Sequence, residues 1–117
     1  MLLYVYTRTC ILHVMDAFVA IAEPNRRQIL EFLSAGERAA GDIVEALPRL
    51  TQPAVSRHLR VLRDSGLVSV RADAQRRLYK LEPAGLEVVE AWLSRYRTLW
   101  RDHLIRLEAQ LREDQSP

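Results

Sequence analysis

The sequence predicts a mainly α-helical domain with one small β-hairpin and a long C-terminal helix. Three observations support this fold class. Up to Gly66, apolar residues recur at spacings of three and four, which is typical of amphipathic helices. Between Leu67 and Leu81, two runs of alternating apolar and polar residues flank a short polar segment, as in a β-hairpin. After Pro83, one apolar seam continues at helical spacing for roughly 29 residues.

Three helices are predicted in the first half of the chain. Asp16 can cap a short helix that carries Phe18 and Ile21 on one face. Pro24 suits the first turn of a second helix. A third helix is expected over residues 41–47, where the following proline ends it.

The fourth helix is the most informative segment. Thr51 is a strong N-cap candidate, and a proline two residues later is tolerated in the first turn. Apolar residues at positions i, i+4 and i+7 predict one buried stripe, formed by Val55, Leu59 and Leu62. Gln, Ser and Arg residues lie largely off that stripe, so the helix combines an apolar back with a polar front.

The alternating segment that follows predicts a hairpin rich in arginine. Residues 67–72 place Leu67 and Ser69 on one side of a strand, and a polar tip over 73–76 leads into a second run over 77–81. Two helices joined by a short turn and followed by a basic hairpin make a winged helix-turn-helix. We therefore predict this architecture, completed by a long C-terminal dimerisation helix.

Positive charge is concentrated in the middle of the chain. The 117 residues include 17 Lys or Arg and 15 Asp or Glu, which gives a net charge of +2. Residues 57–80 hold seven Lys or Arg and two Asp or Glu, whereas 1–56 and 81–117 are each net negative. This clustering fits a polyanion partner, because phosphate contacts need Lys and Arg. A solvated basic face without a partner is the alternative.

The fourth helix and the hairpin together predict an interface with double-stranded DNA. Gln can bond two adenine edge atoms and Arg two guanine edge atoms, and a helix N-terminus favours a phosphate. An ordinary surface helix is the alternative, which the basic hairpin disfavours. The predicted DNA-binding residues are Thr51, Gln52, Pro53, Ser56, Arg57, His58, Arg60, Arg71, Arg76 and Arg77.

Three stretches, AEPNRRQILEFL, QPAVSRHLRVLRDSGLV and RRLYKLEPAGL, resemble the ArsR family of bacterial winged helix-turn-helix regulators. The resemblance covers about Asp16 to Leu111. It implies a homodimeric repressor whose fourth helix reads DNA and whose wing lies along the backbone or minor groove. The turn PRL before Thr51 is longer than the shortest family version and lacks its usual Gly, which affects the angle between the two helices.

The metal sites of the family are not matched. Metal-sensing members carry a Cys pair in the helix before the turn, where this chain has GDIVEAL. Other members place Asp and His pairs on the last helix, where this chain has only His103 with Asp102 beside it. Cys10 and His13 supply too few zinc ligands in one subunit, although two such pairs across a dimer would supply four. We expect no metal and no cofactor.

The sequence also lacks a recognisable catalytic constellation. Ser56 and His58 are two residues apart, and residues at that spacing on a helix do not face each other. No Gly-rich phosphate loop, GxSxG or HExxH motif is present. We therefore expect no enzymatic activity.

The apolar seam of the C-terminal helix predicts self-association, because one small domain cannot cover it. Pairing with the same helix of a second copy, aided by the first helix, would bury it. A coiled coil with a foreign partner is the competing interpretation, which would make the chain a protein-interaction module without specific DNA binding. The predicted dimer-interface residues are Phe18, Ile21, Leu93, Tyr96, Trp100, Leu104 and Leu107.

The predicted domain spans residues 16–112, between an N-terminal extension over 1–15 and a tail over 113–117. The extension lacks a basic leader, no stretch approaches a membrane span, and Cys10 is the only cysteine, so we expect a cytoplasmic protein with no membrane partner. Residues 1–14 precede Met15, and the family resemblance begins at Asp16, so we expect them to be dispensable. The alternative is an arm that helps to cover the dimer through Leu2, Leu3, Val5, Ile11 and Leu12. An unknown small-molecule effector is a further expected partner. The aromatic residues near Trp92 and Trp100 are one candidate place for it, although such residues more often form core.

Overall fold

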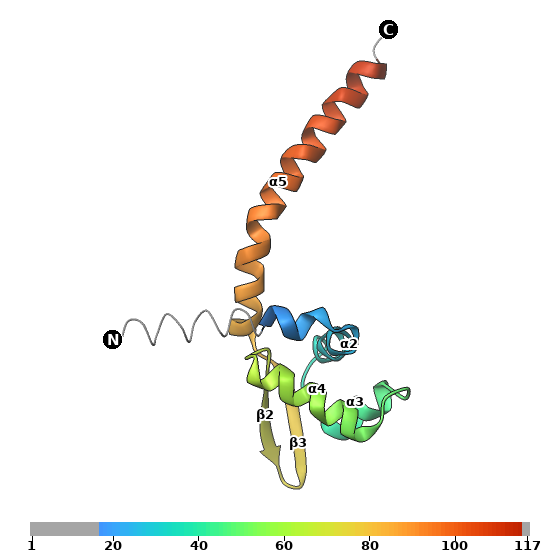
Figure 1. Cartoon of the computed structure of the whole chain (residues 1–117), viewed down its shortest axis with the longest axis vertical. Helices are drawn as coiled ribbons and strands as arrows, with labels where there is room; N and C mark the ends of the chain where they lie inside the picture. Colours follow the sequence, from blue (N-terminus) through green and yellow to red (C-terminus); the bar gives the residue numbers. More distant parts are fainter. Residues whose placement is uncertain (1–16, 116–117) are drawn as a thin grey trace, which may run out of the picture.

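The computed structural model describes residues 17–115, and it confirms a mainly α fold with a small antiparallel sheet (Figure 1). Figure 1 shows the β2–β3 hairpin at one end of the molecule and the last helix projecting from the other. A helical segment over residues 17–22 comes first. It is followed by α2 (Pro24–Leu33), β1 (Arg38–Ala39), α3 (Ala40–Ala46), α4 (Gln52–Asp64), β2 (Val68–Asp73), β3 (Arg76–Leu81) and α5 (Pro83–Gln115).

The ends of α2 and α4 are fixed by local hydrogen bonds. The Glu23 carboxylate accepts a hydrogen bond from the Arg26 backbone N–H at 2.9 Å, and Thr51 Oγ1 accepts one from the Ala54 N–H at 3.3 Å. Each bond satisfies a backbone donor that the first turn of a helix leaves without a partner. Beyond the end of α4, Gly66 has a φ of +77°, which glycine adopts without a Cβ clash.

The core lies between the three helices α2, α3 and α4 and the sheet. The inward stripe of α4 is buried as predicted, since Val55, Leu59 and Leu62 are each no more than 3% exposed. The largest fully buried side chains of the described chain are Ile29, Ile43, Leu62, Leu67 and Val55. This packing fixes α4 so that its opposite face is open to solvent.

The sheet contains a short strand that the sequence did not predict. β1 pairs antiparallel with β3, and the strand order is β1-β3-β2. Two residues are too few for an alternating pattern to be recognised. At the hairpin tip, Asp73 lies opposite Arg76, and the turn places Ala74 at a φ of +57° without the Gly or Asn that usually marks such a turn.

The start of α5 lies directly against the turn that follows α4. A Cβ atom added at Gly85 would lie 2.1 Å from the Gly66 carbonyl oxygen and 2.7 Å from its carbon. The turn is held by two backbone bonds, from Leu67 N–H to the Leu62 carbonyl and from Glu82 N–H to the Leu67 carbonyl, both at 2.9 Å. Glycine at position 85 is therefore a steric requirement of this contact.

α5 is longer than the sequence predicted. It has 33 residues, so residues 113–115, which we placed in the tail, extend the helix. At 1.5 Å per residue its length is about 50 Å. None of its residues is buried. No helix in the described part of the chain is long and apolar enough to cross a membrane.

Several predictions concern residues outside the described range. They are the N-terminal extension over 1–15 with Cys10 and His13, and the N-cap assigned to Asp16.

Candidate nucleic-acid interface

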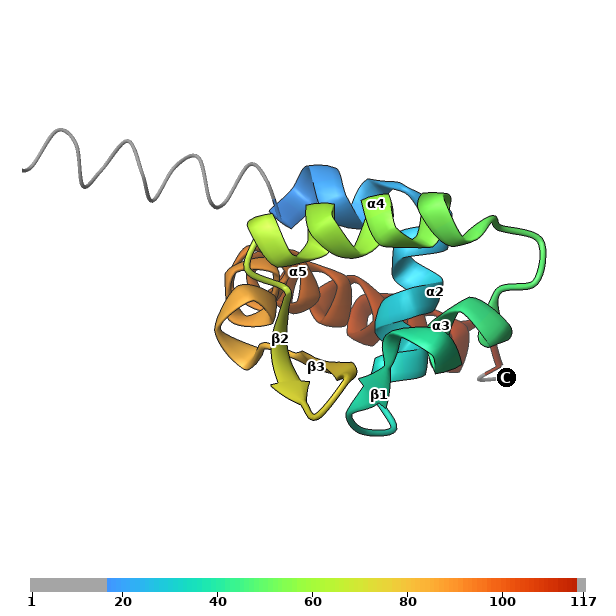
Figure 2. The ribbon, with the colours of Figure 1, turned by 90° about the horizontal axis from the view of Figure 1, so that it is seen from below.

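The open face of α4 carries most of the residues predicted to contact DNA. Figure 2 shows α3 and its turn leading into one end of α4, and β2 leaving the other end. This is the arrangement of a helix-turn-helix followed by a wing. The exposed residues at the start of the helix and along its outer face are Thr51, Gln52, Pro53, Ser56, Arg57 and Arg60.

Arginines from α4 and the wing surround a shared hollow. This hollow, of about 110 Å³, is lined by Ser56, Leu59, Arg60, Arg63, Arg77 and Tyr79. Three guanidinium groups and two hydroxyl groups therefore gather where the helix meets β3. Hydrogen-bond donors of this kind suit a phosphate oxygen. The structure therefore brings Arg77 of the wing close to Ser56 and Arg60 of α4, and all three are residues that we predicted to bind DNA.

The arginines on this surface form no ion pair within the described residues. None of the four ion pairs found over residues 17–115 involves Arg57, Arg60, Arg63, Arg76 or Arg77. Arg76 and Arg77 are exposed at the hairpin tip. Clustered cations without carboxylate partners repel one another unless a polyanion is bound, so the arrangement favours nucleic acid over isolated solvation.

Arg71, another predicted DNA-binding residue, has an intramolecular partner instead. Its guanidinium donates from Nε to Glu37 Oε2 at 2.9 Å and from Nη2 to Glu37 Oε1 at 2.7 Å. The hydrogen bonds from Arg71 lower the pKa of Glu37 below its ordinary value of 4.5. This bidentate pair connects β2 to the segment before β1, so Arg71 orients the wing.

The Glu37–Arg71 pair predicts a pH-dependent contribution to stability. A carboxylate with a lowered folded-state pKa stabilises the fold above its unfolded-state pKa, and that contribution is lost as the pH falls through the lowered value. We expect wild type to have a higher Tm than Glu37→Gln at neutral pH, and the difference to shrink to zero on acidification below pH 4.5. Arg71→Gln should lose the same pH-dependent contribution to stability. A difference that persists in acid would contradict the assignment.

His58 is directed to α2 and not to the open face of α4. It is half-buried, with Nδ1 lying 3.3 Å from Arg26 Nη1 and 3.9 Å from Glu23 Oε2. Partial burial opposes ionisation of Glu23, but the Arg26 backbone hydrogen bond, together with His58 and Asn25, outweighs it and lowers the pKa of the carboxyl. His58 therefore connects α4 to the start of α2, and its predicted contact with DNA stays a prediction.

Sequence reasoning missed some residues that shape this surface. Arg63 lies one helical turn after Arg60, and this spacing could have predicted that both residues lie on the same face of α4. Glu37, Glu23 and Tyr79 lacked any such signal, because each meets its partner only through the tertiary fold.

α5 presents an exposed apolar seam. Of the predicted dimer-interface residues, Leu93, Tyr96, Trp100, Leu104 and Leu107 are between 44% and 61% exposed. A hollow of about 630 Å³ along this helix is lined by Tyr96, Leu99, Trp100, His103 and Arg106. Phe18 instead contacts Trp92 edge to face, with ring centroids 5.3 Å apart, and Ile21 packs on the core. A lone chain thus leaves large aromatic groups in water.

The metal-binding residue types remain dispersed. Within residues 17–115, no three His, Cys, Asp or Glu side chains are close enough to share an ion. The His103 ring stacks on Trp100 at a centroid distance of 5.9 Å.

Comparison with known proteins assigns the family. Residues 23–70 match the pattern described as "Bacterial regulatory protein, arsR family". The HTH-type transcriptional regulator Rv2034 of Mycobacterium tuberculosis is 42% identical over 82 residues, which cover 70% of this chain and 76% of that protein. The chain belongs to the ArsR family. The ArsR resemblance of the three sequence stretches is therefore confirmed.

Other comparisons agree with this family and its fold. The transcriptional repressor SdpR of Bacillus subtilis is 33% identical, over 67% of this chain and 86% of that protein. The crystal structure of the ArsR family transcriptional regulator RHA00566 superposes with a TM-score of 0.67 at 28% identity, over 76% of this chain and 91% of that one.

A second solved structure describes an assembly. The homodimeric winged helix-turn-helix DNA-binding domain Mb0332 of Mycobacterium bovis, determined in solution, gives a TM-score of 0.62 at 28% identity. The alignment covers 84% of this chain and 87% of that one. The predicted winged helix-turn-helix is thus confirmed, and the ArsR relatives of this chain include transcriptional regulators and a repressor.

Proposed function

We propose that this chain is a homodimeric, sequence-specific DNA-binding repressor that an effector releases from its operator. The observation that carries the proposal is the hollow between α4 and β3. There Arg60, Arg63 and Arg77 converge beside the exposed face of a capped helix. Membership of the ArsR family supports regulation of transcription.

The proposed contacts divide between bases and phosphates. Gln52, Ser56 and Arg57 lie in the first turns of α4, the part of a recognition helix that reaches base edges. Thr51 and Pro53 border the helix N-terminus, where a phosphate is favoured. Arg60, Arg63, Arg76 and Arg77 would hold the DNA backbone. A two-fold dimer presents two such helices, so we expect an inverted-repeat operator whose half-sites are about one helical turn, or a multiple, apart.

Replacing one arginine of each group tests this division. Arg57→Ala should weaken binding to the specific operator by about 1–3 kcal/mol and relax the preference at one base position. The reason is that the Arg57 guanidinium can donate two hydrogen bonds to the edge of one guanine. Arg76→Ala should weaken binding to specific and random duplexes alike and reduce the salt slope by about one unit. The measurement is a fluorescence-anisotropy titration of both duplexes over a range of salt.

Arg95→Ala, an exposed arginine on α5, serves as the matched control and should leave both affinities unchanged. Equal weakening of both duplexes by Arg57→Ala, combined with altered base preference in Arg76→Ala, would reverse the assigned roles.

A winged-helix module that binds another protein, without specific DNA binding, is the competing function. The unpaired arginines argue against it, since a protein-interaction module has no need of five uncompensated guanidinium groups on one surface. Electrophoretic mobility shift on random duplex at low salt separates the two functions. Absence of any shift would refute the DNA-binding proposal.

The proposal involves no catalytic step, no metal and no cofactor, and it assigns the protein to the cytoplasm. The DNA-binding proposal is supported by membership of the ArsR family and by the hydrogen-bond donors and cations on the surface formed by α4 and β3.

A further inference from the structure

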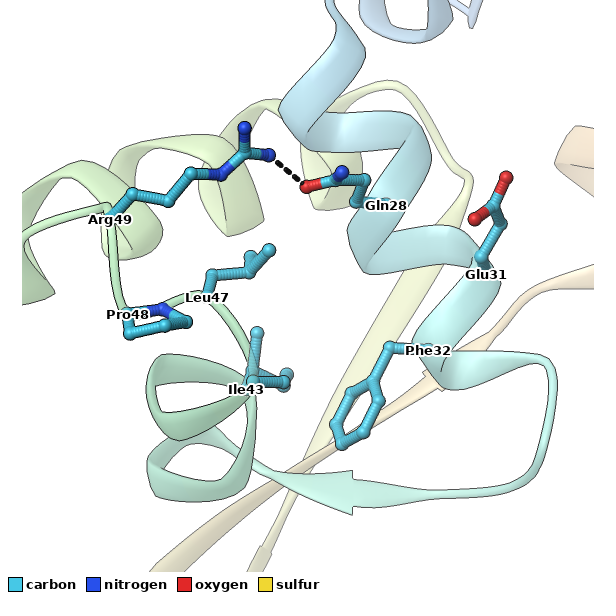
Figure 3. Close-up of a pocket in the computed structure, with 8 residues that line it drawn as sticks. Gln28, Glu31, Phe32, Ile43, Leu47, Pro48 and Arg49 are labelled. Carbon is cyan, nitrogen blue, oxygen red and sulfur yellow. Dashed lines mark hydrogen bonds between the residues drawn. The ribbon is translucent and has the colours of Figure 1, made fainter.

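A cavity of about 430 Å³ lies between α2 and α3, away from the hollow that faces the wing (Figure 3). Its apolar part is formed by Phe32, Ile43, Leu47 and Pro48. The volume falls within the range of small-molecule sites, which combine an apolar lining with a few polar groups.

Polar groups occur on two sides of this cavity. Figure 3 shows Arg49 and Glu31 on opposite sides, with the Phe32 and Ile43 side chains below them. The Arg49 guanidinium donates to Gln28 Oε1 and to Asn25 Oδ1, the latter at 3.2 Å. Both acceptors are neutral amides, and over residues 17–115 Arg49 forms no ion pair. A carboxylate would give this guanidinium a charged, bidentate partner.

The aromatic wall of the cavity is held in place from the sheet side. The Arg38 guanidinium lies over the Phe32 ring, with its central carbon 5.3 Å from the ring centroid. A cation over an aromatic face is attractive, so this contact favours the observed orientation of Phe32 before any ligand enters.

We propose that this cavity binds a small aromatic monocarboxylate and that its occupation weakens DNA binding. The carboxylate would lie on Arg49, the ring between Phe32 and Leu47, and a hydroxyl donor at the far end of the ligand would meet Glu31. The site supplies the effector class for the repressor proposed above, so its regulatory part rests on that function.

Arg49 connects the cavity to α4. It lies in the turn between α3 and α4, two residues before the Thr51 cap, and its bonds to Gln28 and Asn25 tie that turn to α2. Asn25 donates to Glu23 at 3.0 Å, and Glu23 in turn faces His58 of α4. A carboxylate bound to the Arg49 guanidinium would compete with both amides, and the turn before α4 would lose its hydrogen bonds to α2.

A titration in the absence of DNA tests the site. The probe is 4-hydroxybenzoate, followed by ¹H–¹⁵N NMR, with neutral 4-hydroxybenzamide as the matched probe. We expect saturable shifts over residues 28–32 and 43–49 with a Kd of about 0.1–1 mM. The amide should bind at least about tenfold more weakly, because it lacks the charge-assisted pair.

Two variants probe the cavity in different ways. Arg49→Gln should weaken the binding of 4-hydroxybenzoate by about 10- to 100-fold. Ala46→Phe adds a ring to the lining of the cavity and should prevent 4-hydroxybenzoate from binding. Arg95→Gln on α5 is the control and should bind like wild type. The NMR spectrum of each variant reports whether it is folded. Absence of saturable binding, or binding that neither cavity variant weakens, would overturn the site.

A second titration tests the coupling. With 4-hydroxybenzoate at saturation, the Kd of wild type for its operator should rise at least about fivefold, which is within the usual range of allosteric coupling, whereas the Kd of Ala46→Phe should not respond. Ligand binding without this rise would overturn the regulatory part. Failure of the ligand-free protein to bind any duplex would refute the repressor function, while the titration without DNA still decides the site.

Discussion

Gly85→Ala is expected to lower the free energy of unfolding by about 3 kcal/mol, at the upper end of the cost of overpacking. The added Cβ would lie 2.1 Å from the Gly66 carbonyl oxygen. Backbone bonds of Leu67 hold the turn on both sides, so neither the turn nor the start of α5 can move without losing one of them. Thermal unfolding at fixed protein concentration should show a fall in Tm of about 10 °C or more.

Gly41→Ala is the matched control. Gly41 lies within α3, and a Cβ added there would meet nothing within 4 Å. Alanine is favoured over glycine in a helix by up to about 1 kcal/mol, so this variant should have an unchanged or higher Tm. If Gly85→Ala were as stable as Gly41→Ala, the close approach of α5 to the α4–β2 turn would be refuted.

Trp100→Ala is expected to dissociate the proposed homodimer. The Trp100 side chain is 61% exposed in the single chain and borders the hollow on α5. Burial of this ring against a second copy would give it core-like contacts, and its removal would then cost about 3–5 kcal/mol. The dimer Kd measured by sedimentation equilibrium should rise by more than about 100-fold.

Ile105→Ala provides the comparison on the same helix. Ile105 is 57% exposed, but five residues place it about 140° around the helix from Trp100. It should leave the dimer Kd within about threefold, since an exposed side chain outside an interface contributes little. A wild-type monomer at micromolar concentration, or equal effects of the two substitutions, would refute the interface.

The parts of the fold that depend on local signals were predictable from the sequence. Thr51 as a cap, Gly66 as a helix end and the stripe of Val55, Leu59 and Leu62 all lie where the pattern indicated. The hairpin was also found, because alternation over two runs is a strong local signal. These features need only neighbours within a few residues along the chain.

The remaining features depend on contacts between distant segments. β1 is too short to have a pattern, and it becomes a strand only because β3 is available for pairing. His58 lies at the edge of the apolar stripe by its spacing from Val55 and Leu62, which indicates partial burial. Its partners Glu23 and Arg26, however, come from another part of the chain. In the sequence, Arg71 also has the pattern of an unpaired arginine on the wing, and only the fold brings Glu37 beside it. Such pairings have no signature in a single sequence.

The candidate site was predicted in the same uneven way. Gln52, Ser56 and Arg57 are exposed, as an amphipathic helix requires, but the position of Arg63 beside Arg77 depends on the angle at which the wing leaves α4. That angle depends on contacts between segments that are distant in the sequence, and the Glu37–Arg71 pair is one contact that the wing makes.

The two faces of α4 have an evolutionary consequence. Within the described structure, the side chains of Gln52, Ser56 and Arg57 form no hydrogen bond or ion pair with the rest of the domain, while Val55, Leu59 and Leu62 hold the helix in the core. Substitutions of these side chains by other helix-compatible residues are therefore expected to change stability by about 0.5 kcal/mol or less. After gene duplication, one copy can acquire a different operator through a few such changes while it keeps the same fold, the same cavity and the same α5.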